Sequence, residues 1–100
     1  MNKYGLQNKF YAIEGKKDQL ISLLLKASKL VLSSDSCHLY MISEDKTDGN
    51  CVWITEVWDT KEAHDKALME PKVLELIKDA LPLLSDMPQK GIVLEIIGGI

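Results

Sequence analysis

The run CVWITEVWDTKEAHD, residues 51–65, contains a strand, a helix start and a histidine in close succession. Up to Trp58 the run is rich in β-branched and aromatic residues, which is typical of a half-buried or fully buried strand. Asp59 or Thr60 then supplies an N-cap for a helix. We therefore expect a strand that ends near Trp58, followed by a short helix over 60–69.

His64 lies on the inner side of this predicted helix. Helical spacing places it on one stripe with Ala67 and Leu68, and this stripe must pack on the sheet. An imidazole that points into an apolar, tryptophan-lined space is a candidate catalytic base or substrate hydrogen-bonder. The alternative is a histidine at the edge of the core, bonded to a backbone carbonyl or to Glu56, with no chemistry.

The rest of the chain supplies the other elements of a small α+β domain. The pattern predicts strands over 4–14, 37–44 and 92–97, helices over 17–33 and 71–84, and a connector over 87–91. Asp48-Gly49-Asn50 marks a hairpin turn between the two middle strands. The order β-α-β-β-α-β predicts a ferredoxin-like antiparallel sheet with its helices on one face. Helical spacing turns these side chains inward: Leu20, Leu24, Ala27, Val31, Val73, Leu74, Ile77, Leu81 and Leu84.

Composition and charge limit the class of protein. The 100 residues are 46% apolar and 27% charged, which predicts one globular domain over 1–100 and excludes wholesale disorder. The net charge of −3 gives no electrostatic reason to bind nucleic acid or an anionic membrane. No apolar run approaches the roughly 20 residues that cross a bilayer. We expect a cytoplasmic protein.

The two cysteines are expected to be free thiols. If Glu44 pairs near Cys51 across the hairpin, then Cys37 lies opposite Trp58. The two sulfur atoms are then on the order of 20 Å apart, which is beyond the reach of a disulfide. Free thiols indicate a reducing compartment.

The strands are apolar on both sides. Leu39 and Met41 alternate with Tyr40 and Ile42, so neither face of this strand is polar. Two helices cover only one face of a ferredoxin-like sheet, and the other face would expose an apolar patch. This pattern predicts a homodimer that packs sheet against sheet.

Three features together resemble the antibiotic biosynthesis monooxygenase (ABM) family of dimeric α+β barrel proteins. They are Gly15 after the first strand, the segment Thr55–Asp65, and Pro71 after the short helix. The resemblance covers essentially the whole chain. It implies a homodimer of ferredoxin-like subunits, each with a pocket between sheet and helices. For some members it implies oxidation of quinols or other phenols by O₂ without metal, flavin or haem, whereas other members have no established reaction.

The resemblance leaves two functions open. The first is a cofactor-independent monooxygenase, an oxidoreductase acting on a quinol-like or polyphenolic substrate. Such a phenol must lose a proton before it gives an electron to O₂, and His64 is the candidate acceptor. Asn8, in phase with the apolar residues of its strand, could hydrogen-bond a substrate oxygen. Tyr40, Trp53 and Trp58 are candidate pocket walls, although alternation does not say which of them face the pocket.

The second function is a non-catalytic family member that binds a small apolar ligand or acts in a stress response. The haem-degrading relatives in the same superfamily also have an asparagine seven residues before the glycine, as Asn8 stands before Gly15. Their spacing would place a tryptophan near Lys66 and a haem-ligating histidine near Leu76, and neither residue type is present there. The resemblance therefore disfavours haem degradation, and we expect no cofactor and no metal.

Glu56 is an inward charge if its strand is central. It could pair with a lysine, orient His64, or guard the sheet against edge pairing.

The order of elements is also that of RNA-recognition modules, which stack bases on a basic, glycine-containing aromatic strand. The third strand here has Glu56 and no Lys, Arg or Gly, so the sequence argues against RNA binding.

Overall fold

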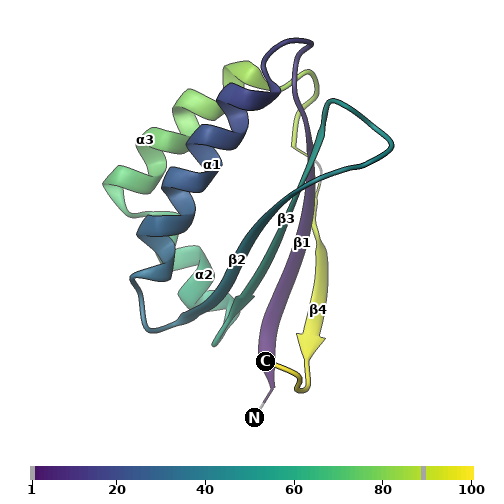
Figure 1. Cartoon of the computed structure of the whole chain (residues 1–100). Helices are drawn as coiled ribbons and strands as arrows, with labels where there is room; N and C mark the ends of the chain where they lie inside the picture. The colour runs from purple at the N-terminus through teal and green to yellow at the C-terminus, as the bar shows by residue number, and fades with distance from the viewer. Residues whose placement is uncertain (1, 89) are drawn as a thin grey trace.

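A four-stranded antiparallel sheet with the strand order β2-β3-β1-β4 forms one layer of the fold. The structure is a computed structural model that describes residues 2–88 and 90–100. The strands are β1 (Lys3–Tyr11), β2 (Cys37–Glu44), β3 (Cys51–Trp58) and β4 (Ile92–Ile96). The helices are α1 (Lys17–Leu32), α2 (Lys61–Ala67) and α3 (Pro71–Ala80), with a 3₁₀ turn at Leu81–Leu83. All of them lie on one side of the sheet, and the other side is bare (Figure 1). The predicted ferredoxin-like α+β fold is confirmed.

The helices begin and end where local chemistry dictates. Pro71 stands at the first turn of α3, where its missing N–H costs no hydrogen bond. Within the predicted span 71–84, the α-helix ends at Ala80 and tightens into the 3₁₀ turn, as Pro82 near the end of that span suggests. Leu74 was expected to face inward, but it is 40% exposed. Leu76 instead lies on the inward stripe with Val73.

The first strand is shorter than predicted. It ends at Tyr11, and the Ala12 N–H donates to the carbonyl oxygen of Asn50 at 2.8 Å. Ala12 also forms an isolated bridge with Leu84, which ties this end of the sheet to the segment after α3. Gly15 then turns the chain into α1 with a φ of +84°, a conformation that side chains disfavour. Part of the predicted connector, Gln89, lies outside the described residues.

The β2–β3 hairpin forms as predicted, but Glu44 pairs with Val52, one position away from the Cys51 used in the sequence argument. Cys37 lies opposite Trp58, and both cysteines are buried and free. At the turn, one carboxylate oxygen of Asp45 accepts hydrogen bonds from the N–H groups of Thr47 and Asp48. These local bonds organise the loop.

A β-bulge changes the phase of β2 near its start. Cys37 pairs with Trp58 and Leu39 pairs with Val57, so His38 is an extra residue in the ladder. Cys37 packs with Trp58 on the helix side, whereas Leu39 falls on the open side. Beyond the bulge, alternation places Tyr40 on the helix side, next to the β3 residue that pairs with it.

The bare face of the sheet is apolar. By register, Met41 of β2 and Ile92 and Leu94 of β4 lie on this face. They are 47%, 56% and 42% exposed, respectively. Within the described residues, no helix covers these side chains (Figure 1). The face is therefore a patch of the kind that marks an interaction surface.

Candidate functional site

A cavity of about 300 Å³ lies between the sheet and the helices. Its lining is mostly aliphatic and comes from β1, β2, β3 and all three helices. Polar atoms enter it from five side chains: Asn8, Tyr40, Glu56, Trp58 and His64. An apolar hollow with a few convergent polar groups is the usual form of a small-molecule site.

The start of α2 places His64 at this cavity. Thr60 is the N-cap, and its hydroxyl oxygen accepts the N–H of Ala63 at 3.1 Å. One turn along, the His64 ring faces inward as its helical spacing predicted, and its side chain is 12% exposed. The ring packs edge-on against Trp58, with centroids 5.7 Å apart at 84°, and lies 5.7 Å from the Tyr4 ring.

The neighbours of His64 determine which ring nitrogen carries the proton. Nδ1 lies 3.0 Å from a carboxylate oxygen of Asp65. Hydrogen bonds from Lys61 and then from His64 hold the pKa of Asp65 below its usual range, so this group is an ionised acceptor. Because a carboxylate can only accept, Nδ1 must donate. In the neutral imidazole the lone pair is therefore on Nε2, the nitrogen turned toward Glu56 in the cavity wall.

Glu56 is a buried carboxyl group in the middle of this site. Its side chain is 6% exposed, and one of its oxygens accepts the indole N–H of Trp58 at 2.9 Å. The same oxygen is 3.8 Å from Nε2 of His64. Burial raises the pKa of Glu56, while the Trp58 hydrogen bond and the nearby imidazole act in the opposite direction. Glu56 therefore faces His64 from a central strand of the sheet.

Replacing Glu56 with glutamine is expected to stabilise the fold at neutral pH. A raised pKa in the folded state means that the contribution of Glu56 to stability is present below its ordinary pKa of 4.5 and is lost as the pH rises. Urea unfolding should show Glu56→Gln more stable on the order of 1 kcal/mol at pH 7.5, and the gain should disappear near pH 4. Glu75→Gln, on the exposed side of α3, is the matched control. A variant less stable than the parent at pH 7.5 would contradict this prediction.

Asn8 also lines the cavity, from the middle of β1. Its amide packs against the backbone of Gly91, where a Cβ would collide with the Asn8 side-chain oxygen and lie 2.9 Å from a methyl carbon of Leu6. Gly91 therefore leaves room for the amide, and sequence reasoning missed it. The sequence holds one indication of this contact: a glycine just before the last strand, where glycine often marks a close approach of backbone and side chain.

The substitution Gly91→Ala should displace Asn8 and weaken the site. The added methyl group cannot be accommodated unless the amide and Leu6 both move. We expect a loss of about 1–3 kcal/mol in unfolding free energy, measured by thermal or urea denaturation. Gly98→Ala is the control, since no atom lies within 4 Å of its added carbon. Equal stability of the two variants would show that Asn8 is not held by this contact.

The three predicted aromatic walls do not all face the cavity. Tyr40 and Trp58 line it, and burial beside Glu56 raises the pKa of Tyr40, so its hydroxyl stays protonated and can donate. Trp53 lies on the open side of the sheet and is not part of this wall. Its indole N–H donates to Asp45 at 3.0 Å, and the ammonium of Lys9 is 4.9 Å from the ring centroid.

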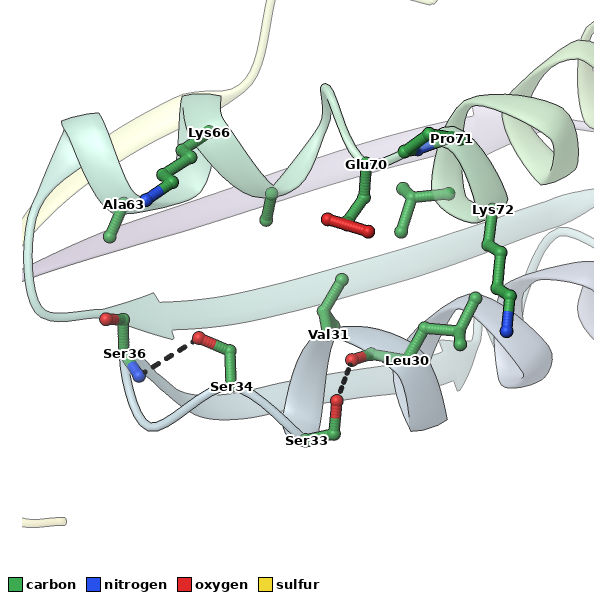
Figure 2. Close-up of a pocket in the computed structure, with 12 residues that line it drawn as sticks. Leu30, Val31, Ser33, Ser34, Ser36, Ala63, Lys66, Glu70, Pro71 and Lys72 are labelled. Atoms are coloured by element: carbon green, nitrogen blue, oxygen red, sulfur yellow. Dashed lines mark hydrogen bonds between the residues drawn. The ribbon is translucent and has the colours of Figure 1, made fainter.

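A second depression, of about 610 Å³, lies where the end of α1 meets the junction of α2 and α3 (Figure 2). Its serines make local bonds: the Ser33 hydroxyl donates to the carbonyl of Leu30 at 2.6 Å, and the Ser34 hydroxyl accepts the N–H of Ser36 at 3.2 Å. It has neither a histidine nor an aromatic side chain in its lining. The smaller cavity at His64 is therefore the candidate site.

Clusters of metal-ligating side chains and membrane-spanning helices were both sought among the described residues. Among residues 2–88 and 90–100, no three His, Cys, Asp or Glu side chains gather closely enough to hold a metal ion. The second histidine, His38, contacts Asp59 at 2.6 Å, away from the cavity. Over the same residues, every helix is too short or too polar to span a lipid bilayer.

Comparison with known proteins finds one matching protein family. The model of the antibiotic biosynthesis monooxygenase family matches residues 3–79. A candidate antibiotic biosynthesis monooxygenase from Chloroflexus aurantiacus is 33% identical, with a TM-score of 0.88 over 98% of this chain and 96% of that one. No curated protein matches the chain.

More distant structures share the fold alone. A Nitrosomonas europaea protein with the same candidate name is 9% identical, with a TM-score of 0.89 over 95% of this chain and 90% of that one. A Caulobacter crescentus counterpart is 12% identical, with a TM-score of 0.83 over 99% and 92% of the two chains. The family match, the Chloroflexus relative and the shared fold agree, and the chain belongs to the antibiotic biosynthesis monooxygenase family.

Proposed function

We propose that the protein is a cofactor-independent monooxygenase that oxidises a quinol-like or polyphenolic small molecule with O₂. The observation that carries the proposal is the imidazole of His64 at the wall of an apolar cavity, with Nδ1 3.0 Å from Asp65 and Nε2 turned toward Glu56. Family membership supports a monooxygenase-type activity. The phenolic substrate is what the resemblance to quinol-oxidising family members implies, and an apolar cavity with an aromatic wall would suit it.

The proposed reaction begins with a proton transfer. A substrate hydroxyl bound beside His64 gives its proton to Nε2, so the O–H bond breaks and an N–H bond forms. The resulting phenolate is electron-rich enough to reduce O₂. One oxygen atom joins the substrate carbon skeleton, and the other leaves as water with two substrate hydrogens. For a hydroquinone the product is a hydroxyquinone, which balances atoms and electrons.

Other residues of the cavity would orient the substrate. The amide of Asn8 and the protonated hydroxyl of Tyr40 can both donate to a second substrate oxygen. Trp58 provides a flat wall for a planar ring, and the aliphatic lining excludes bulk water from the phenolate. The rival function, a non-catalytic ligand-binding protein, requires no base at the cavity, so an imidazole turned into the cavity supports the enzyme.

Oxygen uptake with a panel of substituted hydroquinones and naphthohydroquinones tests the proposal. The protein is first treated with a chelator and dialysed, so that adventitious metal cannot oxidise the quinol. We expect uptake above the uncatalysed rate for at least one compound, with stoichiometric quinone formation. Uptake no faster than the blank across the whole panel would overturn the enzymatic assignment.

A homodimer formed through the bare sheet face is part of the same proposal. The exposed apolar side chains on that face support it, because such patches are rare on monomers. Leu94→Asp places a charge on the edge strand β4 of this face and should convert a dimer of about twice the 11.2 kDa chain mass into a monomer. Sedimentation at micromolar concentration measures this, with Leu25→Asp on the exposed side of α1 as control. A monomeric parent would contradict the proposal.

A cytoplasmic location goes with this function. The two buried thiols, Cys37 and Cys51, are unpaired, and a reducing compartment keeps them so. Burial raises the pKa of Cys37 to about 11, so this thiol is unreactive at neutral pH.

A further inference from the structure

One buried ionisable group of the cavity has no role in the proton transfer described above. Glu56 lies on a central strand with its side chain 6% exposed, in an environment that strongly disfavours a charge. A glutamine or an apolar residue would pack there without that energetic cost. A carboxyl group at such a position calls for a function that depends on its charge.

Two side chains contact or face the Glu56 carboxyl group: the indole of Trp58 and the imidazole of His64. The Trp58 indole donates to one carboxylate oxygen at 2.9 Å, which fixes the orientation of the carboxyl plane. Nε2 of His64 lies 3.8 Å from the same oxygen and, in the neutral ring, has no proton to donate. Two acceptors therefore face each other across a short gap inside a cavity. The arrangement becomes attractive only when a proton reaches the imidazole.

We propose that Glu56 is a positioning residue for His64: its carboxylate holds the imidazole toward the cavity and stabilises the imidazolium formed when Nε2 takes the substrate proton. The inference rests on the proposed function, since the proton comes from the phenolic hydroxyl. No additional reactant is needed, because one O–H bond breaks, one N–H bond forms and the carboxylate stays unchanged.

The other ionisable groups near this pair do not duplicate the role of Glu56. On α2, Asp65 binds the opposite nitrogen of the ring and is itself held by Lys61 at 2.8 Å. On the sheet, the hydroxyls of Tyr4 and Tyr40 stay protonated because burial raises the pKa of each. The Cys37 thiol on β2 is neutral for the same reason. Glu56 is therefore the carboxyl group that faces Nε2 among the described residues.

Nuclear magnetic resonance of the two imidazoles tests the coupling without any substrate. Long-range ¹H–¹⁵N spectra follow each ring as the pH falls, and His64→Gln assigns the signals because the chain has two histidines. In Glu56→Gln, the pH midpoint at which the His64 ring gains its second proton should fall by about one pH unit. His38, which contacts Asp59, should keep its midpoint and serves as an internal control. An unchanged His64 midpoint overturns the inference.

Oxygen uptake separates this inference from the proposed function. With a hydroquinone that the parent oxidises, Glu56→Gln should lower the plateau of kcat/KM about tenfold and move its low-pH limb to lower pH. A residue with only a structural role would not move that limb. A shifted midpoint together with no uptake by the parent would support the pairing of Glu56 with His64 and overturn the monooxygenase assignment.

The wild-type protein gives a second measurement if Glu56→Gln fails to fold. The ¹³C signal of the Glu56 carboxyl carbon should change in two steps with pH, and one of them should follow the His64 midpoint. A single step at a pH unrelated to His64 would overturn the inference.

Discussion

Replacing His64 with alanine should lower kcat/KM for hydroquinone oxidation by about 10²–10⁴-fold, the range lost when a general base is removed. The variant keeps the rest of the cavity but lacks the imidazole that accepts the phenolic proton in the proposed reaction. Binding should change less than turnover, because alanine leaves the apolar lining in place. Steady-state oxygen uptake across pH 5–9 measures both parameters, and the low-pH limb seen with the parent should disappear.

His38→Ala is the matched control for this experiment. It removes the other imidazole, which contacts Asp59 and does not line the cavity. Its activity should stay within about twofold of the parent. Thermal denaturation of both variants checks that the folds are intact. Equal uptake by the His64 variant and the parent would remove the catalytic assignment from His64 and leave only the architecture.

Replacing Trp58 with alanine should cost about 3–5 kcal/mol of unfolding free energy, the usual effect of deleting a large buried aromatic side chain. Trp58 is 1% exposed and packs with Val31, Cys37 and Val73. The loss is a large share of the roughly 5–15 kcal/mol that stabilises a small domain. Urea denaturation followed by circular dichroism measures it, since removing an indole also changes the fluorescence.

Trp58→Phe separates the two contributions of this indole. Phenylalanine keeps most of the apolar contact but cannot donate a hydrogen bond to Glu56. We expect an intermediate loss of about 1–3 kcal/mol, larger at pH 7.5 than at pH 4, because the carboxylate is the partner left without a donor. A phenylalanine variant as unstable as the alanine variant at both pH values would show that the hydrogen bond is not what matters.

Local sequence patterns predicted the architecture well because helix faces and hairpin turns depend on residues that are close together in the sequence. The inward stripe of α1 follows from the 3.6-residue spacing of Leu20, Ala27 and Val31, all of which are buried. The hairpin register follows from Asp48-Gly49-Asn50, which leaves few ways to pair the two strands. Helical spacing likewise placed the His64 ring at the cavity, although its catalytic role stays a prediction.

The errors have equally specific causes. Trp53 and Trp58 stand an odd number of positions apart, so in a regular strand they face opposite sides, and only one could line a pocket. Leu74 was grouped with Val73 although adjacent helical residues differ in direction by about 100°. The contact of Asn8 with Gly91 joins residues far apart in the sequence, and no local pattern reports such a pair.

The extra residue at His38 affects how site residues can be transferred between relatives. Because the strand gains one position there, Tyr40 reaches the wall of the cavity, where simple alternation from Cys37 would have put Leu39. In a homologue with an uninterrupted ladder, the side chain that occupies the place of Tyr40 stands one position nearer the start of its strand. An alignment without a gap at this point would therefore compare a residue of the cavity wall with one from the open face of the sheet.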